Sequence, residues 1–371
     1  MTPNRLVTRV LQPQAPLMPP SPGVAGAPLA ELRLREERTR TMLQALAWLL
    51  ALCAYPFVAT PFFVYQIGAQ ALVLGLIALS LSVLAGLGGM VSLSQMTVAG
   101  IAAYLVAILG TSSVGAISLG WAPWLAVLVA LVASVLAALA IGALSIRTEG
   151  IRTIMITLAI GVAFFYLTQQ NYAVFNGFQG FSRIEAPMLF GVDLGEPRAF
   201  YFLCLAVSAV AVFGVMYLRR TPFGIGLQGV RDNARRMASL GFDVALHRLV
   251  AHAMAGLIAG AGGVLFVYYN HRISPGSINS AAMINVLVIA VLGGMRHPIG
   301  SFLGAALFVL LQNFAIDFVS RDRFNLVIGS VFLVLILVSP DGLLGLWERL
   351  RVLARPDTRH RAMPGGSSRK T

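Results

Sequence analysis

The stretch "PFFVYQIGAQALVLGLIALSLSVLAGLGGMVSLSQMTVAGIAAYLVAILG", residues 61–110, contains no charged residue. It lies within a longer run, Thr41 to Ile146, that also lacks Asp, Glu, Lys and Arg. A water-soluble core cannot bury so long an uncharged run, whereas each crossing of a lipid bilayer needs about 20 mostly apolar residues. The sequence therefore predicts an all-α polytopic membrane protein.

Composition agrees with this fold class. Of the 371 residues, 58% are hydrophobic and 11% are charged, against about 25% charged residues in a typical soluble domain. The net charge is +13, but the basic residues lie in short stretches between or beyond apolar segments, where Arg orients helices and meets lipid headgroups. We therefore expect contact with membrane lipid and no nucleic acid partner. Cys53 and Cys204 lie far apart in apolar segments and are read as small hydrophobic residues.

Apolar segments divide the chain into three parts. Residues 1–40 form a Pro-rich tail, predicted to be disordered, followed by a short charged helix, "ELRLREERTR". Residues 41–345 form the transmembrane domain, and residues 346–371 form a basic tail. About ten crossings are predicted, at 42–60, 67–86, 93–110, 121–146, 151–172, 199–218, 248–269, 277–295, 299–318 and 325–345.

The positions of Arg predict the orientation of these crossings. The connection from Arg219 to Arg248 is rich in Arg and holds two Asp, whereas the connection 171–198 holds two Arg against three acids. Alternation along ten crossings places the Arg-rich connections on one side, together with both termini. Because Arg and Lys concentrate in cytoplasmic loops, that side is expected to be the cytoplasm, and 219–247 is then the largest cytoplasmic loop.

A short motif suggests an internal repeat. The sequence "LGGM" occurs at 87–90 and again at 292–295, and each copy precedes a polar bend and a small-residue segment. Both copies would run in the same direction, as in a parallel repeat. Chance recurrence of small residues in membrane helices is an equal alternative.

The loop "RRTPFGIGLQGVRDNARRMASLGFD", residues 219–243, contains G-x-G-x-x-G at Gly224, Gly226 and Gly229. A dinucleotide site needs a strand before this motif and a βαβ unit around it, but an apolar membrane helix precedes it here. A phosphate-binding G-x-x-x-x-G-K-[ST] loop is also missing, because the one Lys of the chain is Lys370. The chain is therefore expected to bind no cofactor and not to act as an enzyme, and any ATP would be held by another protein.

The end of this loop predicts a short amphipathic helix. Asp232 or Asn233 is a plausible N-cap and Gly241 a plausible residue just beyond the C-terminus. Ala234, Met237 and Ala238 would form a small apolar face, with Asp232 and Arg236 four residues apart beside it. So short a helix is unstable alone, which leaves two uses: docking in a groove of a partner protein or lying on anionic lipid.

Other polar residues suggest no catalytic or metal site. His247 and His252 are five residues apart with no acid or Cys to complete a zinc set, and His252 is expected at the membrane interface. The segment Gly256–Gly263, "GLIAGAGG", has the spacing of close helix packing. Small and polar residues within crossings are candidates for lining a translocation pathway, although packing and bonding to their own helix are alternatives; they are Gly88, Gly89, Ser92, Ser94, Gln95, Thr97, Thr153, Thr157, Gly293 and Gly294.

Residues 221–294, with "DNARRMASLGF" at their centre, closely resemble the permeases of bacterial branched-chain amino acid ABC importers. "LSLSVLAGLGGMVSLSQMTVAGIAAYLVAIL", residues 79–109, is similar to their early glycine-rich segment. "LSIRTEGIRTIMITLAIG", residues 144–161, looks more like the LivM-type permease than like its LivH-type partner. The resemblance covers about residues 65–345.

The resemblance implies a role for the cytoplasmic loop. In this family the matching segment docks on the ATP-binding subunits, which favours partner docking over lipid contact. The residues carried over to this coupling element are Gly229, Arg231, Asp232, Asn233, Arg235, Arg236, Met237 and Gly241. Many relatives have a Glu and an Ala pair inside this helix, where this chain has Ala234 and Arg236–Met237, so the identity of its ATPase stays open.

The resemblance also implies partners and a solute. The expected assembly contains two ABC ATPase subunits that bind ATP and magnesium, a second LivH-type permease and a periplasmic solute-binding protein, all at a bacterial inner membrane. The solute would be a branched-chain or related amino acid, with urea or short amides as alternatives. An ion-coupled secondary transporter would need acids or cations at the bilayer midplane, and the centres of the predicted crossings contain neither Asp nor Glu.

Overall fold

A computed structural model of the chain describes residues 52–189 and 192–318, together with residues 50, 329–330, 333, 342–343 and 345. The chain separates into two units, Met1–Tyr55 and Pro56–Thr371. In the first unit the described residues 52–55 are helical. All further description concerns the second unit. The predicted tails 1–40 and 346–371 lie outside the described residues, as do residues 42–49 and 51 of the first predicted crossing and most of the crossing predicted at 325–345.

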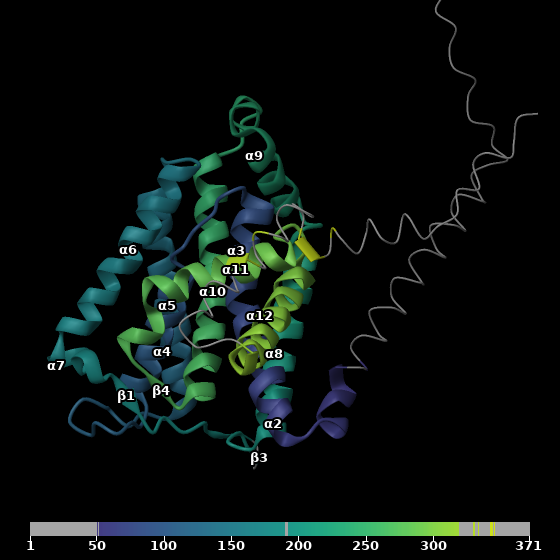
Figure 1. Ribbon diagram of the computed structural model, residues 1–371. Coiled ribbons are helices and arrows are strands. Elements are labelled where there is room, and N and C mark those ends of the chain that lie inside the picture. Colours follow the sequence, from purple (N-terminus) through teal and green to yellow (C-terminus); the bar gives the residue numbers. More distant parts are fainter. Residues whose placement is uncertain are drawn as a thin grey trace, which may run out of the picture. The chain divides into compact units, whose positions relative to one another are not determined.

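Helices account for most of the second unit (Figure 1). Their bounds are α2 (Pro61–Phe63), α3 (Gln70–Ser82), α4 (Gln95–Leu109), α5 (Pro123–Ser145), α6 (Ile151–Gln170), α7 (Tyr172–Phe175), α8 (Pro197–Leu218), α9 (Pro222–Ser239), α10 (Val244–Asn270), α11 (Ser280–Gly293) and α12 (Pro298–Phe318). Two π-helical turns, Val64–Ala69 and Val83–Leu87, flank α3, and 3₁₀ turns occur at Gly177–Gln179 and Pro275–Ile278.

In the part of the chain that the structure describes, four two-residue strands form two small antiparallel pairs. Strand β1 (Phe181–Ser182) pairs with β4 (Arg272–Ile273), with Phe181 opposite Ile273. Strand β2 (Met188–Leu189) pairs with β3 (Val192–Asp193). The first pair joins the segment after α7 to the end of α10.

The prediction of a polytopic helical membrane protein is confirmed. Within the described residues, six helices are long and apolar enough to cross a membrane: Pro61–Leu87, Pro123–Ser145, Ile151–Gln170, Pro197–Leu218, Val244–Asn270 and Pro275–Gly293. Two shorter apolar helices, Gln95–Leu109 and Pro298–Phe314, coincide with two further predicted crossings. The total of ten crossings, the side on which the termini lie and the internal repeat stay predictions.

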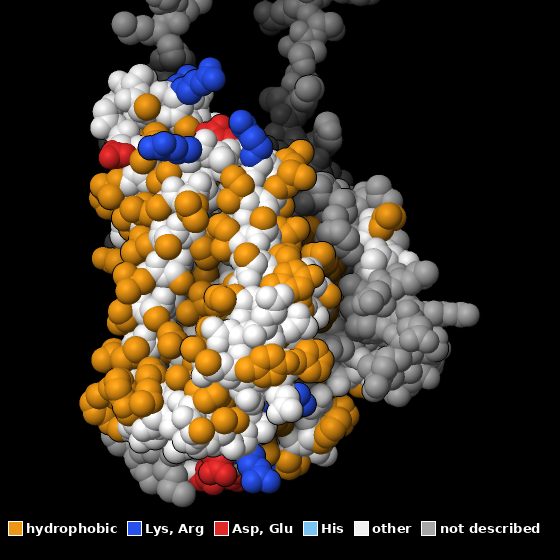
Figure 2. All heavy atoms as spheres, turned by 90° about the vertical axis from the view of Figure 1, so that its left-hand side faces the viewer, with side chains coloured by type: hydrophobic (Ala, Val, Ile, Leu, Met, Phe, Trp, Pro, Cys, Tyr) orange, Lys and Arg blue, Asp and Glu red, His pale blue; other side chains and the backbone are white. Residues whose placement is uncertain are grey.

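Polar and apolar side chains are separated along the helices. Figure 1 shows α9 at one end of the helices, and α7, β1 and β4 at the other end. On the face that carries α6, apolar side chains cover the middle of the molecule and charged side chains gather at its two ends (Figure 2). This banding is the pattern that a bilayer requires, because ionised groups are costly within the hydrocarbon region.

The core forms around α10, which packs against α3, α4 and α5. Glycines make these contacts close: Gly256 and Gly260 face Ala138 and Ser134 of α5. Gly262 faces Ile77 of α3. A Cβ added at these positions would collide with the neighbouring helix, so the prediction of close packing for Gly256–Gly263 is confirmed.

His252, which the sequence places at the membrane interface, is buried against a neighbouring helix. Its side chain is 2% exposed and lies against Gly142 of α5, whose missing side chain provides the space. His252 Nδ1 is 2.9 Å from the carbonyl oxygen of Arg248. Because α10 begins at Val244, His252 lies about two turns inside the helix, and its position relative to the membrane interface stays a prediction.

Candidate functional site

The first half of α9 explains the glycine motif. Thr221 caps the helix by accepting a hydrogen bond from the backbone N–H of Gly224 at 3.2 Å, and Pro222 occupies the first turn, where its missing N–H costs nothing. All three motif glycines lie inside this helix rather than in a loop. Gly226 makes room for His247 of α10, and Gly229 makes room for the sulfur of Met237. The motif therefore serves close packing.

A kink at Asn233 divides α9 into two helical segments. Asn233 has φ −158° and ψ 92°, and its side-chain oxygen accepts from the N–H of Arg236 at 2.9 Å. Of the two N-caps predicted, the structure thus selects Asn233. Gly241 has φ +88°, and the N–H groups of Gly241 and Phe242 donate to the carbonyls of Ala238 and Met237 at 3.0 and 3.1 Å. This is a Schellman arrangement, with Gly241 in the position predicted for it.

The kink changes the charge pairing expected for the loop. Asp232 and Arg236 lie on opposite sides of Asn233 and do not share one regular helix. Asp232 instead pairs with Arg231, whose Nε and Nη2 both lie 2.8 Å from the Asp232 carboxylate. The predicted pair at four-residue spacing is therefore replaced by a pair of neighbours.

The second segment presents an exposed tip. Arg235 and Arg236 are exposed, Leu240 is 66% exposed, and Met237 is half-buried beneath them against Gly229. His247 anchors the base of this tip by stacking on Phe223, with ring centroids 5.1 Å apart. We call this tip, residues 235–240, the knob; it carries apolar and cationic side chains and lies next to the start of α10.

Arg231 points in a different direction from Arg235 and Arg236. Its Nη1 donates to the carbonyl oxygen of Gly86 at 2.6 Å, in the π-helical turn Val83–Leu87 at the end of α3. The aliphatic part of Arg231 lies on Gly89, where an added Cβ would be 2.6 Å from Cγ. This residue therefore joins α9 to the membrane-embedded part of the protein.

A second contact joins α10 to the connection between α5 and α6. Arg248 Nη2 donates to Glu149 at 2.8 Å and its Nη1 to the carbonyl of Ile146 at 3.2 Å. The hydrogen bond from Arg248, followed by its charge, holds the pKa of Glu149 below its usual range; burial opposes this shift, and the charges of Arg235 and Arg152 support it. The connection 146–150 thus lies near the knob.

Several of the pathway candidates meet in a buried polar turn, residues 88–97, which links the π-helical turn after α3 to the first residues of α4. The Ser92 and Ser94 hydroxyls are 2.8 Å apart, and the side chain of Gln95 accepts from Ser80 at 3.0 Å. Thr97 is buried beside Gly161 of α6, and its hydroxyl has no partner within the described part of the chain. Ser80 was missed by sequence reasoning, although a Ser within so apolar a helix is itself a signal.

The polar turn is also fixed to α6. The N–H of Leu93 donates to the Thr157 hydroxyl at 3.0 Å, and Thr157 donates in turn to the carbonyl of Thr153 at 2.9 Å. Thr157 therefore bonds to its own helix, which is one of the alternatives considered for it, and its hydroxyl also accepts from the turn. Whether any of these residues lines a pathway stays a prediction.

Gly293 and Gly294 lie away from the polar turn, where α11 meets α12. Gly293 packs against the backbone of Gly300, and Gly294 has φ +99°, a conformation that favours glycine. Their geometry is that of a tight helix connection. The pathway role predicted for them is not tested by this placement.

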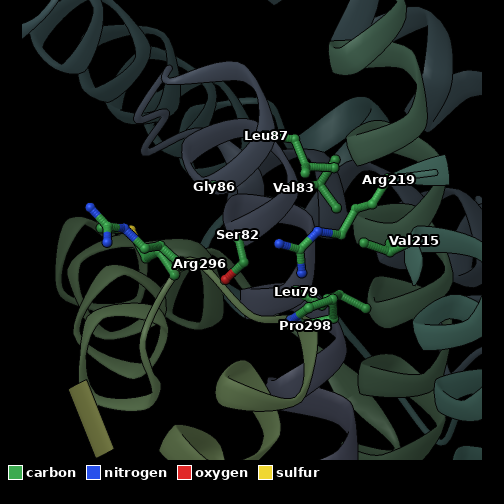
Figure 3. Close-up of a pocket in the computed structure, with 10 residues that line it drawn as sticks. Leu79, Ser82, Val83, Gly86, Leu87, Val215, Arg219, Arg296 and Pro298 are labelled. Carbon is green, nitrogen blue, oxygen red and sulfur yellow. The ribbon is translucent and has the colours of Figure 1, made fainter. Parts of the chain in front are cut away.

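A small cleft lies beside the end of α3, between α8 and the start of α12. It is lined by Leu79, Ser82, Val83, Gly86, Leu87, Val215, Arg219, Met295, Arg296 and Pro298. Figure 3 shows the Arg219 side chain reaching in toward Ser82 and Leu79, while that of Arg296 turns away. The described residues contain no group of three or more His, Cys, Asp and Glu side chains that could hold a metal ion.

Comparisons with known proteins agree on one family. Residues 63–338 match the family described as the permease component of the branched-chain amino acid transport system. The high-affinity branched-chain amino acid transport system permease protein LivM of Salmonella typhimurium is 26% identical, over 81% of this chain and 74% of its own length. LivM of Escherichia coli is also 26% identical, over 77% and 72%.

A more distant relative transports a different solute class. The nucleoside ABC transporter permease protein NupC of Lactococcus lactis is 24% identical, over 62% of this chain and 74% of its own length. No solved structure matches the chain significantly.

Proposed function

This chain belongs to the family of branched-chain amino acid transport system permeases, and from that premise we propose that it forms half of the translocation pathway of an ATP-driven importer. A second, LivH-type permease would form the other half. Two ABC ATPase subunits would bind ATP and magnesium, and a periplasmic binding protein would deliver the solute. The chain itself would carry out no covalent chemistry.

The observation that carries this proposal is the knob at the end of α9. Its helical segment is too short to persist alone, yet Asn233 and Gly241 cap it at both ends and Met237 holds it against Gly229. Arg235, Arg236 and Leu240 remain exposed to the surroundings. A rigid, exposed segment with cationic and apolar side chains is suited to bind in a groove of a partner protein.

Charge distribution supports a cytoplasmic position for the knob. Among the described residues, the α9 end carries Arg147, Arg152, Arg219, Arg220, Arg231, Arg235, Arg236, Arg248 and Arg296. The end with β1 and β4 carries Arg183, Arg198 and Arg272. By the positive-inside rule the α9 end faces the cytoplasm, where ATPase subunits would bind. The membrane would be a bacterial inner membrane, and the binding protein would meet the opposite end.

The LivM relatives favour branched-chain amino acids as the solute. The residues of the polar turn are small and uncharged, and they do not discriminate among small neutral solutes. Urea and short amides therefore remain alternatives, and the nucleoside permease relative adds nucleosides as a further class to test. A secondary transporter is disfavoured, because the central parts of the described membrane helices contain no Asp or Glu.

Co-purification tests the proposal. A tagged chain would be expressed with the other components of its transport system and extracted in mild detergent. We expect a second permease and ATPase subunits to co-purify, with ATP hydrolysis stimulated by the binding protein loaded with leucine. If urea, an amide or a nucleoside stimulates ATP hydrolysis and leucine does not, the proposed solute is wrong but the assignment to ATP-driven importers stands. A chain that purifies alone and supports no ATP hydrolysis would overturn the proposal.

A further inference from the structure

We propose that Arg231 is a positioning residue that transmits movement of the docking knob to the broken segment between α3 and α4. The inference rests on the proposed function and assigns one residue to one step of it. The family resemblance implies a place for Arg231 among the ATPase-docking residues. Its contacts instead lie inside the permease.

The guanidinium of Arg231 is held at both ends. Nη1 donates to the Gly86 carbonyl at 2.6 Å, while Nε and Nη2 lie 2.8 Å from the Asp232 carboxylate. Asp232 therefore fixes the direction in which the guanidinium faces. The side chain of Arg231 is one-third exposed, and its Nη1 is directed to the end of α3 while Nε and Nη2 bind Asp232.

The acceptor is a backbone group that the local helix leaves available. In the π-helical turn Val83–Leu87, the N–H groups of Gly89 and Met90 donate to the carbonyls of Ala85 and Leu84. The Gly86 carbonyl receives Arg231 instead. Such π-helical turns occur frequently at functional sites because the regular hydrogen-bond pattern changes there. The π-helical turn that follows α3 is thus joined to α9 by a charge-assisted hydrogen bond.

Gly89 completes the contact. It has φ +68°, which favours glycine, and the missing side chain lets Cγ of Arg231 lie directly on the backbone. On another side of the same turn, Val83, Gly86 and Leu87 border the small cleft (Figure 3). The turn is therefore bound by α9 on one side and borders a small cleft on another.

Movement of this turn would reach the buried polar residues. The chain continues from Gly89 into the polar turn, where the Leu93 N–H is bonded to Thr157 of α6 and Gln95 to Ser80 of α3. A displacement at Gly86 is therefore passed to the start of α4 and to α6. Among the described residues, Arg231 is the α9 residue that donates a hydrogen bond into this region.

The test separates docking from transmission. Arg231→Met keeps the length of the side chain but removes its donors, and Arg231→Lys keeps one charged donor. Arg220→Met is the matched control, because Arg220 is exposed at the same end and its substitution removes the same charge. Each variant would be reconstituted with its partners, and ATPase association, ATP hydrolysis and solute uptake would be measured.

We expect Arg231→Met to retain ATPase association within about twofold, while solute transported per ATP hydrolysed falls by about tenfold or more, as for loss of a hydrogen bond to a charged group. Arg231→Lys should recover part of the coupling, and Arg220→Met should resemble wild type. A change in the ratio of uptake to hydrolysis is not produced by a smaller amount of folded protein.

A second variant approaches the contact from the other side. Gly89→Ala places a methyl group against Cγ of Arg231, and we expect the same uncoupling with association retained. The inference is overturned if Arg231→Met couples normally, or if it loses ATPase association as a docking residue would. If wild type itself recruits no ATPase, the proposed function fails, which is a separate result.

Discussion

The glycines of α10 face three different neighbouring helices, so the packing of this helix is decided one residue at a time. Gly256 and Gly260 lie against α5, Gly262 against α3, and Gly263 against the Ala99 carbonyl of α4. In a membrane, close approach of helices depends on such small residues, because lipid supplies no hydrophobic drive for helix association.

Replacing Gly263 with Ala should therefore separate α10 from α4. The new Cβ would meet the backbone of Ala99, which cannot rotate away as a side chain could. We expect a loss of about 1–3 kcal/mol in the free energy of unfolding, measured by denaturation in detergent. Gly214→Ala is the control: no atom lies within 4 Å of the added Cβ, and it should be neutral or slightly stabilising. Equal effects of the two changes would contradict this account.

The pair formed by Arg248 and Glu149 makes a prediction about pH. Because the folded state lowers the pKa of Glu149, the pair stabilises the protein above the ordinary pKa of a Glu side chain, and this stabilisation is lost as the pH falls through the lowered pKa. Glu149 is exposed, so the contribution is small, on the order of 0–1 kcal/mol.

The comparison is between wild type and Glu149→Gln. Their difference in thermal unfolding should be present at pH 7 and should disappear at a pH below the lowered pKa of Glu149. Glu185→Gln, which changes an exposed acid at the other end of the helices, serves as the control. A difference that is the same at both pH values would show that the ion pair is not its cause.

At the scale of elements, α9 shows what sequence predicts and what it does not. The caps at Asn233 and Gly241 are local, since each bonds to residues within a few positions, and they could be predicted. The inward direction of Arg231 could not be predicted, because it depends on Gly86 and Gly89, which are distant in sequence. The burial of His252 was missed for the same reason: Gly142 of another helix makes its space.

The α9 knob leads to a prediction about partner binding. Replacing both Arg235 and Arg236 with Glu reverses the charge of the exposed tip, and we expect at least about a tenfold loss of ATPase association, since rim and anchor charges of interfaces govern such binding. Membrane insertion should be unaffected, because both side chains are exposed. Co-purification yields would measure the effect, with Arg220→Glu as a control of equal charge change per residue. Undiminished association of the double variant would remove α9 from the docking surface.

At the scale of the whole molecule, the predicted architecture rests mostly on the length of the uncharged apolar segments and on the positions of the Arg residues. The eight described apolar helices coincide with predicted crossings, because the bilayer imposes helix length and composition on every crossing. The break between α3 and α4 was less predictable. Its polar residues could be listed, but their partners Ser80 and Thr157 are set by packing.

The most direct measurement is solute uptake into proteoliposomes containing this chain, a LivH-type permease and the ATPase subunits, with binding protein outside and ATP enclosed. We predict accumulation of radiolabelled leucine that requires both ATP and the binding protein and that fails with the Arg235 and Arg236 double variant. Uptake that persists without ATP and follows an imposed ion gradient would contradict an ATP-driven importer and would assign the chain to secondary transport.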